Sequence, residues 1–85
     1  MYKLEIYSRD NCAFCQMAKY ALQSKGIRYE EYDVTFDSAL ADEMRKRANR
    51  YSVPQIFLNQ EHIGGYEDLM VAIREGKFSQ FINSV

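Results

Sequence analysis

Asn11-Cys12-Ala13-Phe14-Cys15 holds both cysteines of this 85-residue chain, and the predicted architecture is arranged around it. Residues 2–7, just before it, alternate and are rich in aromatic and β-branched side chains, which predicts a strand. Residues 13–25, just after it, carry apolar side chains at helical spacing and are followed by Gly26, which predicts a helix. The two cysteines therefore lie where a strand gives way to a helix.

This position has consequences for the chemistry of the cysteine pair. Cys12 falls at the start of the predicted helix, where unpaired N–H groups and the helix dipole favour negative charge. A thiolate is stabilised there, so we expect the pKa of Cys12 to lie below the free value of about 8.5. Cys15 lies one turn further on, about 5–6 Å away, and can reach a sulfur bound to Cys12. The pair has the layout of a redox couple.

Cysteines at this spacing also occur in zinc sites and in structural disulfides. Zinc needs four ligands, and His62 is the one further good ligand, so we expect no metal. A structural bridge that closes so short a loop would remove little chain entropy. The setting between a strand and a helix favours redox chemistry instead.

Length and charge narrow the function classes further. The length suits one domain, which we expect to span 1–85. Eleven Lys and Arg residues against 12 Asp and Glu give a net charge of −1, so no basic footprint for nucleic acid is present. No apolar stretch approaches the ~18 residues of a membrane span, and no export signal opens the chain. We therefore expect a cytoplasmic monomer whose cysteines form a transient couple in a reducing compartment.

Periodicity and turn residues predict the remaining elements. We expect strands at 27–34, 55–58 and 61–63, and helices at 38–49, 66–75 and 78–85, with Asp37 or Ser38 as an N-cap. The first two strands should be parallel and the last two should form a hairpin around Asn59-Gln60. The sequence thus predicts a mixed α/β fold, β-α-β-α-β-β-α plus a short C-terminal helix, with a four-stranded sheet covered on both faces.

Several side chains carry more specific expectations. The basic run Arg45-Lys46-Arg47 is interpreted as the solvated face of a helix, and His62 as an exposed strand residue rather than a catalytic base. Tyr7 and Tyr66 flank the motifs and are candidates to line the site. The four methionines are expected to fill the core.

Three separated motifs follow this order of elements. Cys12-Ala13-Phe14-Cys15 follows the first strand, Ser52-Val53-Pro54-Gln55-Ile56-Phe57 opens the third, and His62-Ile63-Gly64-Gly65-Tyr66-Glu67-Asp68-Leu69 opens the third helix. Together they resemble a dithiol glutaredoxin over essentially the whole chain. The resemblance implies a thioredoxin-like fold and an enzyme, a glutathione-disulfide oxidoreductase. Glutathione would be its co-substrate, and its other partners would be glutathionylated or disulfide-containing proteins.

The resemblance also implies roles for individual residues. Cys12 matches the nucleophile, Cys15 the resolving cysteine, and Val53 precedes a proline that the family holds in cis. Arg9 stands where the family often has Lys, near the thiolate and the glycine end of glutathione. The implied glutathione-binding residues are Arg9, Phe14, Ser52, Val53, Pro54, Gly65, Tyr66, Glu67 and Asp68. The Gly64-Gly65 pair before a helix supports the assignment of Tyr66, Glu67 and Asp68 independently, because it lets an anion approach the N–H groups of a helix N-terminus.

The motif departs from the common Cys-Pro-Tyr-Cys at Ala13 and Phe14. Ala13 restores the N–H that proline lacks at the first helical position, and Phe14 keeps a ring without a hydroxyl. One alternative left open is an iron–sulfur carrier, in which two chains would share a [2Fe–2S] cluster through Cys12 and glutathione; Cys15 argues against it. Another is a thioredoxin-like hydrogen donor fed by a flavoenzyme reductase, which the Gly64–Asp68 stretch argues against.

Overall fold

A computed structural model describes residues 2–79 of the chain. They form β1 (Leu4–Ser8), α1 (Ala13–Ser24), β2 (Glu30–Asp33), α2 (Ser38–Ala48), β3 (Gln55–Leu58), β4 (Glu61–Gly64) and α3 (Tyr66–Arg74). The predicted order of elements is confirmed over this range. The predicted helix at 78–85 lies outside the described residues except for its first two positions.

The strands form one four-stranded sheet in the order β2-β1-β3-β4. β1 pairs in parallel with β2, while β3 is antiparallel to both β1 and β4. A sheet with both kinds of pairing follows from the connections, since α1 carries the chain back between parallel strands and a two-residue turn joins β3 to β4. Asn59 and Gln60 in that turn have φ of 50° and 74°, as a type I′ hairpin turn requires.

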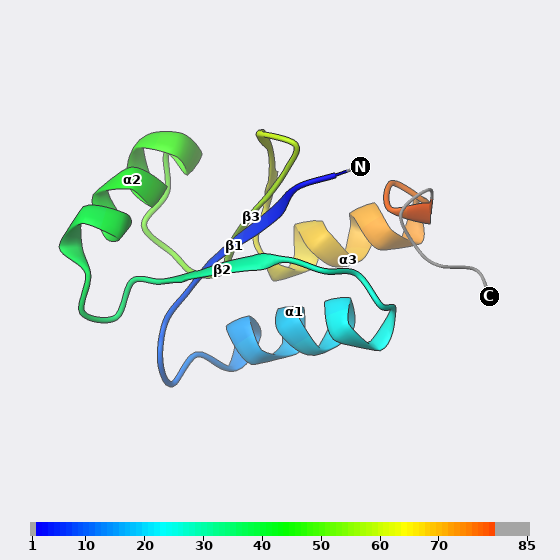
Figure 1. The fold of residues 1–85 in the computed structure, drawn as a ribbon, viewed down its shortest axis with the longest axis horizontal. Helices are drawn as coiled ribbons and strands as arrows, with labels where there is room; N and C mark the ends of the chain where they lie inside the picture. Colours follow the sequence, from blue (N-terminus) through cyan, green and yellow to red (C-terminus); the bar gives the residue numbers. More distant parts are fainter. Residues whose placement is uncertain (1, 80–85) are drawn as a thin grey trace.

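Helices cover both faces of the sheet (Figure 1): α2 lies on one side, and α1 and α3 lie together on the other. Alternation along β1 sends Leu4 and Ile6 into the core beneath α1 and α3, and Tyr7 into the core beneath α2. This arrangement corrects the expectation that Tyr7 lines the site, because its side chain is fully buried on the α2 side.

Two more expectations need correction. β2 is shorter than predicted, because the Ile27 N–H donates back to Leu22 O and so closes the turn that follows α1. Met17 is exposed on α1, whereas Met44 is buried as expected. The predicted cap of α2 is confirmed, with Asp37 Oδ1 accepting the Leu40 N–H at 3.0 Å.

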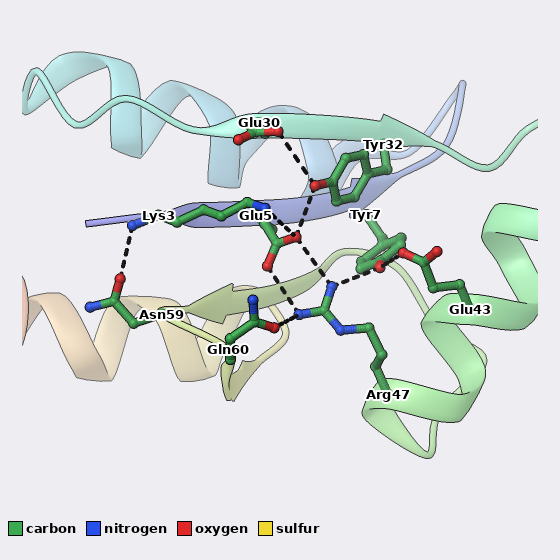
Figure 2. A network of polar contacts seen from close by, with 9 residues as sticks. All are labelled: Lys3, Glu5, Tyr7, Glu30, Tyr32, Glu43, Arg47, Asn59 and Gln60. Carbon is green, nitrogen blue, oxygen red and sulfur yellow. Dashed lines mark hydrogen bonds and ion pairs between the residues drawn. The ribbon is translucent and has the colours of Figure 1, made fainter. Parts of the chain in front are cut away.

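Arg47 does not belong to a solvated face, contrary to the sequence interpretation. Its guanidinium donates to Glu5 Oε1 at 3.0 Å, to Tyr7 Oη at 2.8 Å and to Gln60 Oε1 at 3.1 Å (Figure 2). It also lies 4.0 Å from the ring centroid of Phe57. Arg47 therefore fastens α2 to the sheet through the buried Glu5 carboxylate.

The same network perturbs the titration of its members. Burial raises the pKa of Glu5, but hydrogen bonds from Arg47 and Tyr32 outweigh it and hold this pKa below its usual range. Burial and a hydrogen bond to Glu43 raise the pKa of Tyr7 to about 12. Glu5 is therefore a carboxylate and Tyr7 a neutral phenol at neutral pH.

Within residues 2–79, no helix has the length and apolar character needed to cross a bilayer.

Candidate active site

The cysteine pair lies at the N-terminus of α1. Cys12 is the N-cap, with extended backbone angles of −117° and 104°, and its Sγ accepts the Cys15 N–H at 3.1 Å. The two cysteines form a disulfide with Cα atoms 5.2 Å apart. Cys15 is fully buried while Cys12 is partly exposed, which confirms that Cys15 is the more shielded of the two. An external reactant can therefore reach the sulfur of Cys12 more easily.

The loop before β3 lies opposite the cysteines. Its Val53–Pro54 peptide bond is cis, which confirms the expectation from the resemblance. The carbonyl oxygen of Val53 lies 3.9 Å from Cys12 Sγ. The loop thus places backbone polar groups directly beside the reactive sulfur.

A pocket of about 280 Å³ opens between the cysteine helix, this loop and the start of α3. Its lining residues are Phe14, Ser52, Val53, Pro54, Gly65, Tyr66, Glu67 and Asp68. The structure therefore brings together eight of the nine residues that the resemblance implied for glutathione. The ninth, Arg9, is exposed in the loop before Cys12 and does not line this pocket.

The start of α3 forms one end of the pocket. Asp68 Oδ2 accepts the Gly65 N–H at 2.9 Å and lies 3.5 Å from Arg50 Nη1, so this side chain caps the helix. Gly64 has a φ of 125°, and a Cβ there would overlap the Asp68 carboxylate, so the position requires glycine. Glu67 is exposed and pairs with no other described residue through its side chain. The helix N-terminus faces the pocket with an acidic residue still free to bind.

Gln55 supports the loop beside the cysteines, and the sequence interpretation missed it. Its fully buried side chain donates to Ser52 O at 3.0 Å and to Ser52 Oγ at 3.2 Å. Its Oε1 lies 2.7 Å from His62 Nε2, so the ring must donate from Nε2. Burial, and then the charge of Arg50, hold the pKa of His62 below its usual range. The sequence did hold one indication of this role, since Gln55 is a polar residue at the start of the apolar run Ile56-Phe57-Leu58.

His62 itself differs from the expected exposed strand residue. Its ring is partly buried and lies 4.9 Å from the ring of Phe57, centroid to centroid. The expectation was wrong because His62 is the cross-strand partner of Phe57, where the Phe57 ring and the Gln55 amide offer an aromatic face and an acceptor. His62 contacts Gln55 and, among the described residues, has no hydrogen bond to either cysteine.

Two cysteines lie at the N-terminus of a helix, opposite a cis-proline loop, on a mixed sheet of this strand order. This combination defines the class of thioredoxin-like thiol–disulfide oxidoreductases. Residues 4–63 match the family model described as Glutaredoxin. The chain is 44% identical to Glutaredoxin 3 of Escherichia coli (strain K12) over 69 residues, 81% of this chain and 83% of that protein. It is 37% identical over 83 residues to a probable glutaredoxin of Synechocystis, covering 96% and 94% of the two chains. The chain belongs to the glutaredoxin family.

Solved structures agree with this assignment. The solution structure of glutaredoxin from Brucella melitensis aligns with a TM-score of 0.79 at 36% identity, covering 94% of this chain and 87% of that one. The buckwheat glutaredoxin–glutathione complex aligns with a TM-score of 0.83 at 24% identity, covering 95% and 76%, and shows the shared fold. The function is accordingly thiol–disulfide exchange at the Cys12–Cys15 pair, with the dependence on glutathione that is typical of the family.

Proposed function

We propose that this protein reduces glutathione mixed disulfides and protein disulfides, with Cys12 as nucleophile, Cys15 as resolving cysteine and glutathione held in the pocket beside them. The pocket carries the proposal, because three segments far apart in the sequence meet there next to the more exposed sulfur. The iron–sulfur carrier and the thioredoxin-like hydrogen donor lack a comparable observation in their favour.

The proposed reaction is a series of thiol–disulfide exchanges. The Cys12 thiolate attacks one sulfur of a partner disulfide, forms a mixed disulfide and releases the other partner sulfur as a thiolate. The Cys15 thiolate then attacks Cys12 Sγ, forms the intramolecular disulfide and frees the reduced partner. One glutathione thiolate opens this bridge at Cys12, and a second attacks the bound glutathione sulfur. Oxidised glutathione leaves, and both cysteines are again reduced.

The pocket, together with Arg9 in the loop before Cys12, offers a contact for each part of glutathione. The backbone of Val53 can pair with the cysteine unit as one strand adds to another. The N–H groups of Tyr66 and Glu67, at the start of α3, suit the γ-glutamyl carboxylate, and the helix dipole assists. Arg9 supplies a positive charge for the glycine end. These contacts would hold the glutathione sulfur near Cys12.

A direct test is the glutathione-dependent reduction of a small mixed disulfide. Glutathione reductase, added to the assay, reports the oxidised glutathione as it forms. We expect turnover that depends on both the protein and glutathione. If a thioredoxin-type flavoenzyme reductase supported turnover and glutathione did not, the hydrogen-donor alternative would replace this proposal. An absorbance spectrum of the purified protein, read alongside, would reveal a bound iron–sulfur cluster.

We also propose that the protein works as a single-domain monomer in the cytoplasm. The cytoplasmic part of this proposal rests on the chemistry proposed above, because two cysteines that work as a transient redox couple suit a reducing compartment. The monomer and the single domain follow from the length of the chain alone.

The helix N-terminus should activate Cys12 in the reduced protein. In a Cys15→Ser variant, only Cys12 can react with iodoacetamide, so the alkylation rate reports its thiolate fraction. We expect the rate to reach half its maximum between about pH 4 and 7, which would place the pKa of Cys12 below the free thiol value of about 8.5. A rate that rises only above about pH 8 would show that the helix start does not stabilise the thiolate.

Glu67 is expected to bind the ammonium group of the γ-glutamyl unit. Glu67→Lys removes this contact and adds a repulsive charge, so glutathione affinity should fall by about 1.5–3 kcal/mol, roughly 10- to 150-fold. The Michaelis constant for glutathione measures the effect, and Cys12 alkylation should stay unchanged. Glu75→Lys is the matched control, because Glu75 is exposed at the far end of the same helix.

Asp68→Lys extends this test, although it also removes the helix cap. If neither Glu67→Lys nor Asp68→Lys changed the glutathione kinetics, both side chains would serve the helix alone, and only the backbone part of the site would remain.

A further inference from the structure

A second hollow lies on the outer face of α1, beside the active site. It has a volume of about 470 Å³ and is lined by Gln16, Met17, Tyr20, Ala21, Ser24 and Tyr66. None of these residues is charged, and we call this surface the α1 groove. It is distinct from the glutathione pocket, to whose lining α1 contributes only Phe14.

Three large apolar side chains are exposed on this side of α1, beside the polar Gln16 and Ser24. Phe14 is 54% exposed, Met17 45% and Tyr20 72%, and they follow one another at a spacing of three residues. Residues at this spacing share one side of a helix. Single exposed apolar side chains are common on protein surfaces, but a contiguous row of large ones is typical of an interaction site.

The α1 groove adjoins the glutathione pocket. Tyr66 lines both, and its ring lies 5.7 Å from that of Phe14, centroid to centroid. Since α1 begins immediately after Cys12, the groove extends directly away from the reactive sulfur. A molecule whose sulfur is bound to Cys12 can therefore lie along it.

The length of the groove favours a polypeptide. Along α1 the lining runs from Gln16 to Ser24, eight residues on, which corresponds to about 12 Å of helix at ~1.5 Å per residue. An extended chain covers this distance with about four residues. Glutathione, a tripeptide with its own pocket on the other side of Tyr66, would leave the groove empty. A second copy of this chain seated on Phe14 and Tyr66 would obstruct that pocket.

We propose that the α1 groove binds the segment beside the reacting cysteine of a protein substrate, in extended conformation and with uncharged, apolar side chains. This inference rests on the function proposed above and adds a substrate class to it. Glutathione-linked and disulfide-linked cysteines flanked by apolar residues would be reduced in preference to those flanked by polar ones. Met17 and Tyr20 would provide the contacts and leave the exchange chemistry itself unchanged.

The test compares two synthetic peptides that carry the same glutathionylated cysteine, one flanked by leucines and the other by serines. We expect the protein to favour the leucine peptide about tenfold in kcat/KM, the effect of one well-placed apolar contact. In the double variant Met17→Ser/Tyr20→Ser this preference should fall to about twofold or less. Reduction of a small glutathione–cysteamine mixed disulfide should be unaffected, which also verifies that the variant is folded.

Phe36→Ser is the matched control, because Phe36 is 95% exposed and lies outside both hollows, so this variant should keep the preference. The inference is overturned if the unmodified protein shows no preference, or if the double variant retains it. It is also overturned if sedimentation reveals a dimer that the double variant abolishes, since the groove would then join two copies. If the small mixed disulfide is not reduced at all, the proposed function itself fails, which separates the two conclusions.

Discussion

Cys12→Ser is expected to abolish reduction of every disulfide substrate, by on the order of 10³-fold or more, as loss of a covalent nucleophile does. Cys12 is the only cysteine of the pair with exposed surface, and its sulfur lies at the helix start beside the Val53 carbonyl. Buried Cys15 cannot take over the attack. The measurement is kcat/KM for a glutathione mixed disulfide and for a protein disulfide, with each variant reduced beforehand.

Cys15→Ser should separate the two substrates. Glutathione can itself resolve the intermediate on Cys12, so reduction of glutathione mixed disulfides should persist. Reduction of protein disulfides should be lost, because no second thiol in the protein can displace the bound partner. Equal loss of both activities in a folded Cys15→Ser variant would contradict the assignment of Cys15 as the resolving cysteine.

Arg47→Met is expected to reduce the free energy of unfolding by about 3 kcal/mol, because the buried Glu5 carboxylate loses its guanidinium partner. Among the described residues it then keeps only the Tyr32 hydroxyl, at 2.8 Å, and Lys3, whose Nζ lies 3.8 Å away. This is a large share of the ~5–15 kcal/mol that stabilises a typical domain. Glu5 is 4% exposed and receives hydrogen bonds from both Nη atoms of Arg47 (Figure 2). Urea unfolding of the reduced protein measures the change.

Two further variants identify the cause. Lys46→Met alters the neighbouring exposed residue of α2 and should change the stability by less than about 0.5 kcal/mol. Adding Glu5→Leu to Arg47→Met removes the buried carboxylate that has lost its guanidinium partner and should restore much of the loss. If the double variant were no more stable than Arg47→Met alone, the loss would reflect packing against Phe57 rather than the buried charge.

The pH dependence of stability follows from the same pair. The folded pKa of Glu5 is lower than its unfolded value near 4.5, so the folded state binds the proton less readily. The stabilisation from this carboxylate is present above pH 4.5 and is lost as the pH falls through the lowered folded value. Glu31 has its pKa lowered by Lys19 and Ser8 despite burial, so it contributes in the same pH range. The Glu5→Leu/Arg47→Met variant should therefore lose less stability in acid.

The sequence predicted the parts of this fold that depend on local chemistry. Asp37 as a cap, Asn59-Gln60 as a tight turn and Cys12 at a helix start were expected because each residue type has a strong preference for its backbone position. The β-α-β order and the hairpin then fix most of the sheet. Eight of the nine implied glutathione-binding residues line one pocket, because their motifs all fall at the same end of the sheet.

The contacts that depend on tertiary packing could not be predicted in the same way. Arg47 lies in a basic run, and nothing local indicates that it alone turns inward to Glu5 and Tyr7. Met17 occupies a helix position that suits either core or surface, and only the packing of α1 in the folded protein leaves it exposed. The contacts from His62 through Gln55 to Ser52 join β4 to the active-site loop, so they depend on the pairing of β3 with β4 and not on local sequence.

The most direct test of the central claim is to trap the glutathione intermediate. The Cys15→Ser variant is incubated with oxidised glutathione, and peptide mapping by mass spectrometry locates any adduct. We predict one glutathione per chain, attached to Cys12 and released by free glutathione. A folded variant that alkylates at Cys12 but forms no glutathione adduct there would contradict the account.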